Sequence, residues 1–103
     1  MTVIELPEPI NFEWDLGNQT KSLVKHDITP VEAEQSFFNF KQVLPDYTHS
    51  TKLEPRYVLY GQTNNGKVLF ASFTIRKGRV RIISVRPAKK KERNLYEKLK
   101  KTT

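Results

Sequence analysis

The chain has 103 residues, of which 37% are hydrophobic, and it carries a net charge of +7 and no cysteine. This length is typical of one small domain, and the absence of cysteine excludes disulfides and Cys-ligated zinc. Residues 76–103 contain twelve Lys and Arg against two Glu, a net charge of +10, whereas residues 1–75 carry −3. That asymmetry is as consistent with a polyanionic partner such as nucleic acid as with a basic face that only aids solubility.

The N-terminal residues predict an arm ahead of a compact core. Residues 1–10 contain Pro7 and Pro9 and lack helical periodicity, so we expect an extended or poorly ordered arm. Residues 11–101 would form the core, and residues 1–103 a single domain. The start has no basic region and no long apolar run, which argues against a signal peptide, and no segment approaches the roughly 20 apolar residues of a membrane span. We therefore expect a cytoplasmic protein.

Two short helices are predicted next. Asp15 is a plausible N-cap for a helix through residues 17–26. Thr29 with Pro30 and Glu32 has the pattern of a capping box and predicts a second helix of about ten residues. The apolar face of this second helix is expected to consist of Val31, Phe37 and Phe38. A short connection between the two would make a helical hairpin.

The second half of the chain predicts an antiparallel meander. β-branched and aromatic residues dominate three segments, which turns containing Gly66 and Gly78 separate. The expected strands are residues 57–63, 67–75 and 79–86, with a short edge strand near residues 43–44 and a closing amphipathic helix over residues 89–101. These elements predict an α+β fold with an N-terminal helical hairpin, an antiparallel sheet of three to four strands and a C-terminal helix. The helices would cover one sheet face, and the other would display the strand arginines.

The side chains available for chemistry are mostly basic. His26 and His49 are the only histidines, and no metal-ligand spacing or strained nucleophile turn accompanies them. Lys, Arg, His and Tyr suffice for one reaction, the attack of an RNA 2′-hydroxyl on its own phosphate. That reaction needs a base, an acid and cations that stabilise the transition state, and it needs no metal or other cofactor.

Strand parity limits which arginines can cooperate. Arg79 and Arg81 are two residues apart and share a face, whereas Arg86 is five residues from Arg81 and lies on the opposite face of a regular strand. Either a bulge near residues 82–83 realigns them, or Arg86 acts from the strand end. We favour the strand end because Pro87 terminates the strand.

Several segments, taken in order and spacing, resemble the BrnT-type toxins. They are Phe12-Glu-Trp-Asp15, Gly17-Asn18, Lys25-His26, Glu32-Ala-Glu34, His49-Ser50, Glu54-Pro-Arg56-Tyr57, Gly61-Gln-Thr63, Phe73-Thr-Ile-Arg76 and Arg81-Ile-Ile-Ser-Val-Arg86. The resemblance implies a RelE-like fold and a ribonuclease toxin of a type II toxin–antitoxin pair that inhibits translation and growth. It also implies a BrnA-like antitoxin, whose ribbon-helix-helix domain binds operator DNA and with which the toxin regulates its own operon.

The same resemblance implies a site. The implied catalytic residues are Lys25, His26, Arg56, Arg81 and Arg86. Arg56 and Arg86 are the candidates for clamping phosphate, Lys25 or His26 for proton transfer, and Glu54 for orienting Arg56. The candidate RNA-binding residues are Trp14, Lys21, Arg79, Lys89, Lys90 and Arg93. For Trp14 we favour the alternative that it packs under the first helix.

Two positions depart from the family pattern. Ser22 stands where Asn is usual, and Asp27 stands where Gly is common. A second interpretation therefore stays open, namely an inactive toxin that serves as a non-catalytic nucleic-acid-binding or antitoxin-binding module.

Overall fold

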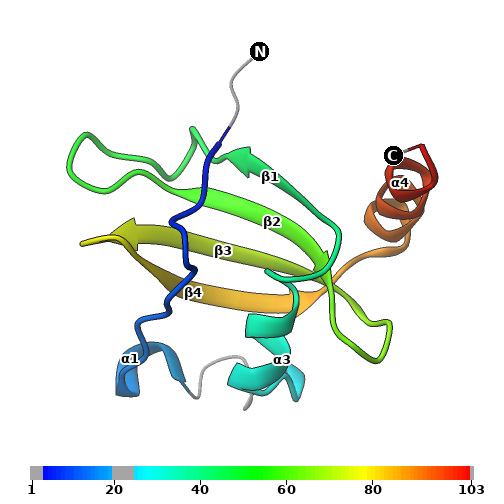
Figure 1. Ribbon diagram of the computed structural model, residues 1–103, viewed down its shortest axis with the longest axis horizontal. Helices are drawn as coiled ribbons and strands as arrows, with labels where there is room; N and C mark the ends of the chain where they lie inside the picture. Colours follow the sequence, from blue (N-terminus) through cyan, green and yellow to red (C-terminus); the bar gives the residue numbers. More distant parts are fainter. Residues whose placement is uncertain (1–3, 20–24, 103) are drawn as a thin grey trace.

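A computed structural model describes residues 4–19 and 25–102. Its elements in chain order are α1 (Leu16–Gln19), α3 (Pro30–Gln35), β1 (Lys41–Pro45), β2 (Tyr57–Gln62), β3 (Val68–Arg76), β4 (Arg79–Pro87) and α4 (Lys90–Lys101). The four strands form one antiparallel sheet in the order β1-β2-β3-β4 (Figure 1). The predicted α+β fold with its antiparallel sheet and C-terminal helix is therefore confirmed.

The core lies on one face of the sheet, which we call the core face. Its side chains include Leu59 from β2, Ala71 and Phe73 from β3, and Val80 from β4, all of which are fully buried. The N-terminal arm crosses this face over all four strands, with α1 and α3 beyond the β4 edge (Figure 1). Because Leu6 and other apolar arm residues pack on the core, the arm forms part of the hydrophobic layer.

Local signals set the starts of the two N-terminal helices. The Asp15 carboxylate accepts the N–H of Gly17 at 2.8 Å at the start of α1. Thr29 and Glu32 form the predicted capping box at the start of α3. Asp27, between these helices, has φ +56°, a left-handed backbone that Asp tolerates better than most residues and Gly adopts freely. The substitution of Asp for the usual Gly is therefore compatible with the turn.

Helix α3 is shorter than predicted. It ends at Gln35 after six residues, and the chain then turns so that Phe37 enters the core with no exposed surface. Val31 and Phe38 are 64% and 63% exposed, so the predicted apolar face of Val31, Phe37 and Phe38 was wrong. The turn after Gln35 changes the direction in which the aromatic pair points, and periodicity extended past that turn misassigned the buried side. Residues 20–24, which belong to the first predicted helix, fall outside the described residues.

A β-bulge in β4 decides which arginines share a face. Phe73 of β3 pairs with Ile82, and the preceding Ser72 pairs with Ser84, so Ile83 is an extra residue without a partner in the ladder. The register then pairs Arg81 with Thr74 and Arg86 with Phe70, and these two β3 residues lie on the same face.

The favoured prediction, that Arg81 and Arg86 lie on opposite faces, was therefore wrong, and the alternative of a bulge near residues 82–83 is confirmed. Parity counting fails here because the bulge adds one residue to β4 and restores the common orientation. We call the face that carries Arg81 and Arg86 the arginine face. Helix α4 covers part of it, with Tyr96 buried against Val68 and Ala88.

Candidate functional site

The arginine face carries two groups of charged side chains. The first, which we call the Arg86 cluster, consists of Arg86, Glu92, Tyr60 and Phe70. Arg86 forms a two-pronged ion pair with Glu92, with Nη1–Oε1 at 2.8 Å and Nη2–Oε2 at 3.0 Å. The Tyr60 hydroxyl donates to Glu92 Oε2 at 3.1 Å, and the Arg86 guanidinium lies 4.2 Å from the Phe70 ring centroid. The Phe70 ring and the Glu92 carboxylate therefore hold the Arg86 guanidinium in a fixed position.

These contacts keep the Arg86 cluster ionised. Hydrogen bonds from Arg86, from the backbone N–H of Lys89 and from Tyr60 lower the pKa of Glu92 from 4.5 to about 2, although partial burial opposes the shift. Glu92 in turn raises the pKa of Arg86, chiefly through the same hydrogen bonds. Burial, followed by the neighbouring Glu92, raises the pKa of Tyr60. At neutral pH the cluster therefore contains a charged pair and a protonated phenol.

The second group, which we call the three-arginine cluster, lies at the other end of β3 and β4. Its members are Arg56, Arg76 and Arg81 with the carboxylates of Glu13, Asp15 and Glu54. Arg81 Nη1 lies 2.8 Å from Asp15 and 3.1 Å from Glu13. Glu54 accepts from Arg76 at 2.6 Å and from Arg56 at 3.2 Å. With three cations and three carboxylates the cluster has no net charge, and its arginines lower the pKa values of Asp15 and Glu54.

Arg56 reaches this cluster because of the loop before β2. Its backbone N–H donates to Ser50 Oγ at 2.8 Å, and its carbonyl accepts from Asp46 N–H at 2.9 Å. The Thr74 hydroxyl donates to the Pro55 carbonyl at 2.6 Å and fixes the loop to β3. Arg56 Nε is buried and has no hydrogen-bond partner within the described part of the chain. A buried donor without a partner is costly, so this side chain is poised to gain an acceptor.

The two clusters are separated along the sheet. The β3 partners of Arg81 and Arg86 are four residues apart, which corresponds to roughly 13 Å at the usual rise of a strand. One phosphate group cannot span that distance. A polyanionic chain with phosphates at intervals can contact both clusters along one face.

Residues 14–92 match the family model for BrnT, the ribonuclease toxin of type II toxin–antitoxin systems. That match covers more than half of the chain. The chain belongs to the BrnT family. No curated protein matches it. As a BrnT-type toxin it has an antitoxin as its partner and RNA as its target.

The structure does not bring all the candidate BrnT site residues together. Lys25 is exposed and His26 is half-buried in the segment that leads to α3. Among residues 4–19 and 25–102, neither side chain forms a hydrogen bond or ion pair with a site arginine. Lys21 lies outside the described residues. The proton-transfer group therefore stays a prediction, whereas the four clustered arginines have a defined geometry.

The candidate RNA-binding residues occupy different surroundings. Trp14 packs against the core and donates its ring N–H to Glu34 at 2.6 Å, an arrangement that fits the packing alternative. Arg79 donates to the Phe12 carbonyl at 2.8 Å. Lys89 and Lys90 are exposed at the start of α4, where Arg93 donates to the Ala88 carbonyl. These α4 residues adjoin the Arg86 cluster and raise the positive charge around it.

Sequence reasoning missed several members of the two clusters. Tyr60 was placed only within a strand, Arg76 and Glu13 only within motifs, and Glu92 only within the C-terminal helix. One signal for Glu92 was available: a carboxylate three residues after Lys89 is the N3 position of a capping box, and its side chain does accept the Lys89 N–H at 2.7 Å. No comparable local signal predicted the contacts of Arg76, because the register of the sheet decides which residues lie beside it.

Two further findings concern membrane spans and metal ligands. Within residues 4–19 and 25–102, no helix is long and apolar enough to cross a membrane. The same part of the chain contains no group of three or more His, Asp or Glu side chains that could hold a metal ion.

Proposed function

We propose that the arginine face binds single-stranded RNA and that this chain cleaves it as an endoribonuclease, by attack of a 2′-hydroxyl on the neighbouring phosphate without a metal ion. The observation that carries the proposal is the bulge at Ile83, which places Arg81 and Arg86 on one face. Family membership supports the substrate class, since BrnT proteins are ribonuclease toxins.

Arg86 is the proposed transition-state clamp. Its guanidinium is positioned by Glu92 and Phe70, so it loses little conformational freedom when a phosphate arrives. A cation that is fixed before the reaction stabilises the charge that develops on the phosphorane-like transition state. Lys89, Lys90 and Arg93 would add electrostatic attraction for the RNA backbone.

The three-arginine cluster is the proposed second phosphate contact. Arg56 and Arg81 would exchange carboxylate partners for phosphate oxygens, which Arg binds in pairs. The buried, unpartnered Nε of Arg56 supports such an exchange. Glu54 would orient Arg56 until RNA binds. Lys25 or His26 would transfer the proton once RNA links the α3 side of the molecule to the arginine face.

The proposed partner is a BrnA-like antitoxin. Its ribbon-helix-helix domain would bind operator DNA and let the complex repress its own operon in the cytoplasm. The family description, which names a type II toxin–antitoxin system, supports a partner of this kind. The chain would act as a single domain in that complex.

The test is RNA cleavage by the purified chain in the presence of EDTA. Wild type is expected to cleave single-stranded RNA and leave 2′,3′-cyclic phosphate ends, and Arg86→Ala to lose most of that activity. Lys101→Ala, which removes one exposed positive charge from the end of α4, is the matched control for net charge. Intact RNA in every sample would contradict the proposal.

A second candidate is a non-catalytic RNA-binding module. It is favoured by one observation: among the described residues neither Lys25 nor His26 contacts the clustered arginines. In that case Arg86→Ala would weaken salt-dependent RNA binding modestly, and neither protein would produce cleaved ends.

A further inference from the structure

Strand β1 is an edge of the sheet with outward-facing backbone groups. Asp46 donates its N–H to the Arg56 carbonyl, and the register places these two residues opposite each other just beyond Pro45. Because backbone direction alternates along a strand, the Gln42 and Leu44 amides face β2, whereas those of Lys41 and Val43 face outward. Pro45 occupies an outward position, where a missing N–H has no cost.

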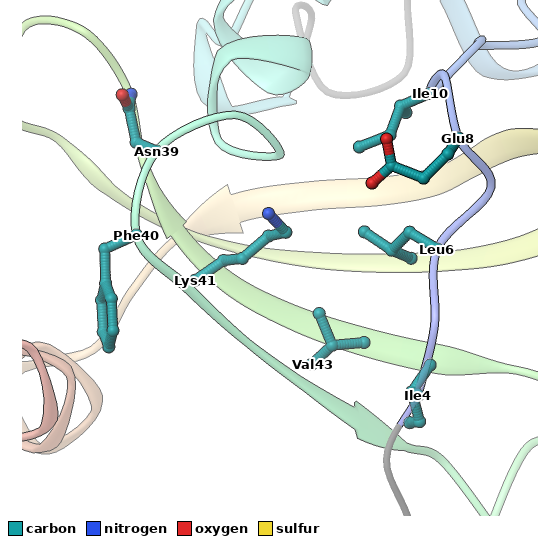
Figure 2. A pocket seen from close by; sticks show the side chains of 8 residues that line it. All are labelled: Ile4, Leu6, Glu8, Ile10, Asn39, Phe40, Lys41 and Val43. Carbon is teal, nitrogen blue, oxygen red and sulfur yellow. The ribbon is translucent and has the colours of Figure 1, made fainter. Parts of the chain in front are cut away.

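The core side of β1 borders a cleft. The cleft has a volume of about 530 Å³ and lies between β1 and the N-terminal arm, with Leu6, Ile10 and Val43 as apolar walls. Figure 2 shows the Lys41 side chain reaching across it toward the arm, while Phe40 points away toward α4. Within residues 4–19 and 25–102, Lys41 forms no ion pair. The cleft therefore offers apolar surface and the Lys41 ammonium group on the β1 side, with the Glu8 carboxylate on the arm side.

The other side of β1 borders a second groove. This groove has a volume of about 250 Å³ and lies between β1 and α4. Leu44 and Leu95 face it and are 47% and 56% exposed. Lys91 and Lys98 stand four residues before and three residues after Leu95, which places them beside it on the helix surface. An apolar floor with a basic rim thus repeats on the second face.

We propose that the β1 edge receives an extended, acidic segment of a partner protein as a fifth strand. The outward backbone groups of Lys41 and Val43 would hydrogen-bond to the segment. Its side chains would point alternately into the arm cleft and the α4 groove, so apolar residues fit both sides. Acidic residues would pair with Lys41 and with the lysines beside Leu95. This inference rests on the proposed function only in that it names the antitoxin as the protein that supplies the segment.

Charge argues against a second copy of this chain on the same edge. Two β1 strands paired about a two-fold axis at Lys41 would bring the two Lys41 side chains together, and any such pairing joins two chains that each carry +7. Like charges held close are destabilising. An acidic segment relieves both repulsions.

The decisive experiment measures the affinity of the antitoxin for variants of the full chain. Val43→Pro removes the outward N–H but not the β1–β2 hydrogen bonds, and we expect about a tenfold weaker Kd. Val43→Ala keeps the N–H and is the matched control, with a change of less than about threefold. Thermal unfolding of both variants shows whether the fold is kept, and RNA cleavage by Val43→Pro is expected to equal wild type.

A second pair of variants tests the groove. Leu95→Asp is expected to weaken antitoxin binding about tenfold, because it adds negative charge where acidic residues dock. Leu53→Asp makes the same change at a loop residue that is 98% exposed and should leave the Kd unchanged. In hydrogen exchange the Val43 amide should become protected only in the complex.

Unchanged antitoxin affinity for Val43→Pro, or an unprotected Val43 amide, would overturn the inference while RNA cleavage and the proposed function stand. Dimerisation of the chain alone that Val43→Pro abolishes would overturn it in favour of a second copy. If RNA stays intact while Val43→Pro weakens the complex, the proposed ribonuclease activity would be wrong and the proposed docking on the β1 edge would stand.

Discussion

The two clusters on the arginine face both consist of arginines paired with carboxylates, but the pairs differ in geometry and exposure. In the Arg86 cluster one carboxylate meets one guanidinium through two parallel hydrogen bonds, and Tyr60 and Phe70 shield the pair. In the three-arginine cluster each carboxylate is shared or exposed, and Asp15 has 54% of its side chain in solvent. Shielding strengthens an ion pair and fixes its geometry, whereas exposure lets an incoming phosphate compete. The difference lies in the carboxylates, because the Arg81 side chain is 16% exposed and that of Arg86 is 29% exposed. We therefore propose a fixed clamp at Arg86 and, through the exposed Asp15, an exchangeable contact at Arg81.

The largest expected effect separates the two clusters by activity. Arg86→Ala should lower the rate of RNA cleavage by a factor of about 10²–10³, the usual loss when one preorganised donor to a transition state is removed. Arg81→Ala should lower it only about tenfold, because its contact is made by exchange. Single-turnover cleavage with saturating enzyme measures both rates. Equal losses would mean that the clusters do not differ in role.

The next effect concerns stability and pH. Glu92→Gln should lower the free energy of unfolding by about 2 kcal/mol at pH 6, because the charged pair with Arg86 is lost, although the amide oxygen of Gln can still accept the Lys89 N–H. The folded-state pKa of Glu92 is about 2 against an ordinary 4.5. Its contribution is therefore complete above pH 4.5 and is lost as the pH falls toward 2.

Urea unfolding at pH 6 and pH 3 tests this prediction. The difference between wild type and Glu92→Gln should shrink at the lower pH. Glu54→Gln, in the exposed cluster, is the comparison variant and should show a smaller difference at pH 6. A difference for Glu92→Gln that is constant across this range would contradict the pKa assignment.

A smaller effect sharpens the view of the three-arginine cluster. Asp15→Asn keeps the side-chain cap of α1 but removes one of the three carboxylates, which frees Arg81 for phosphate. RNA should bind a few-fold more tightly, with a steeper salt dependence, and stability should change little. Fluorescence titration at several salt concentrations measures the slope. Glu8→Gln, which makes the same charge change at an exposed arm residue in the cleft beside β1, should leave affinity nearly unaltered.

The smallest effect lies outside both clusters and provides a baseline. Lys77 and Gly78 form the turn between β3 and β4 with φ values of +51° and +74°. Both values belong to a type I′ turn, in which Asn-Gly is preferred. Lys77→Asn should therefore raise the free energy of unfolding by about 0.5 kcal/mol without changing RNA cleavage. A lower melting temperature would show that Lys77 has a role beyond the turn.

Much of the fold could be predicted because its signals are local. The capping box at Thr29, the strand segments and the glycine turns each depend on neighbouring residues, and the structure confirms them. The end of α3 could not be predicted from periodicity, since the turn at Ser36 responds to the space that Phe37 fills in the core.

The site was predictable in its residue types and less so in its arrangement. Arg56, Arg81 and Arg86 were named from the resemblance to BrnT-type toxins, but the common face of Arg81 and Arg86 depends on an unpaired Ile83, and the sequence did not decide between a bulge there and a regular strand. Glu54 was expected beside Arg56, whereas Glu13 was missed as a partner of Arg81 because it lies 68 residues away along the chain. Contacts of that range exist only after the sheet has formed.

The bulge has a consequence for insertions and deletions. In the stretch from Arg81 to Arg86, removal of the one unpaired residue would leave the two arginines four residues apart in a regular strand and therefore still on one face. A straight strand of the present length would instead place them on opposite faces. The number of residues in this stretch and the presence of the bulge are therefore coupled. A relative with one residue fewer here would keep the shared surface without a bulge.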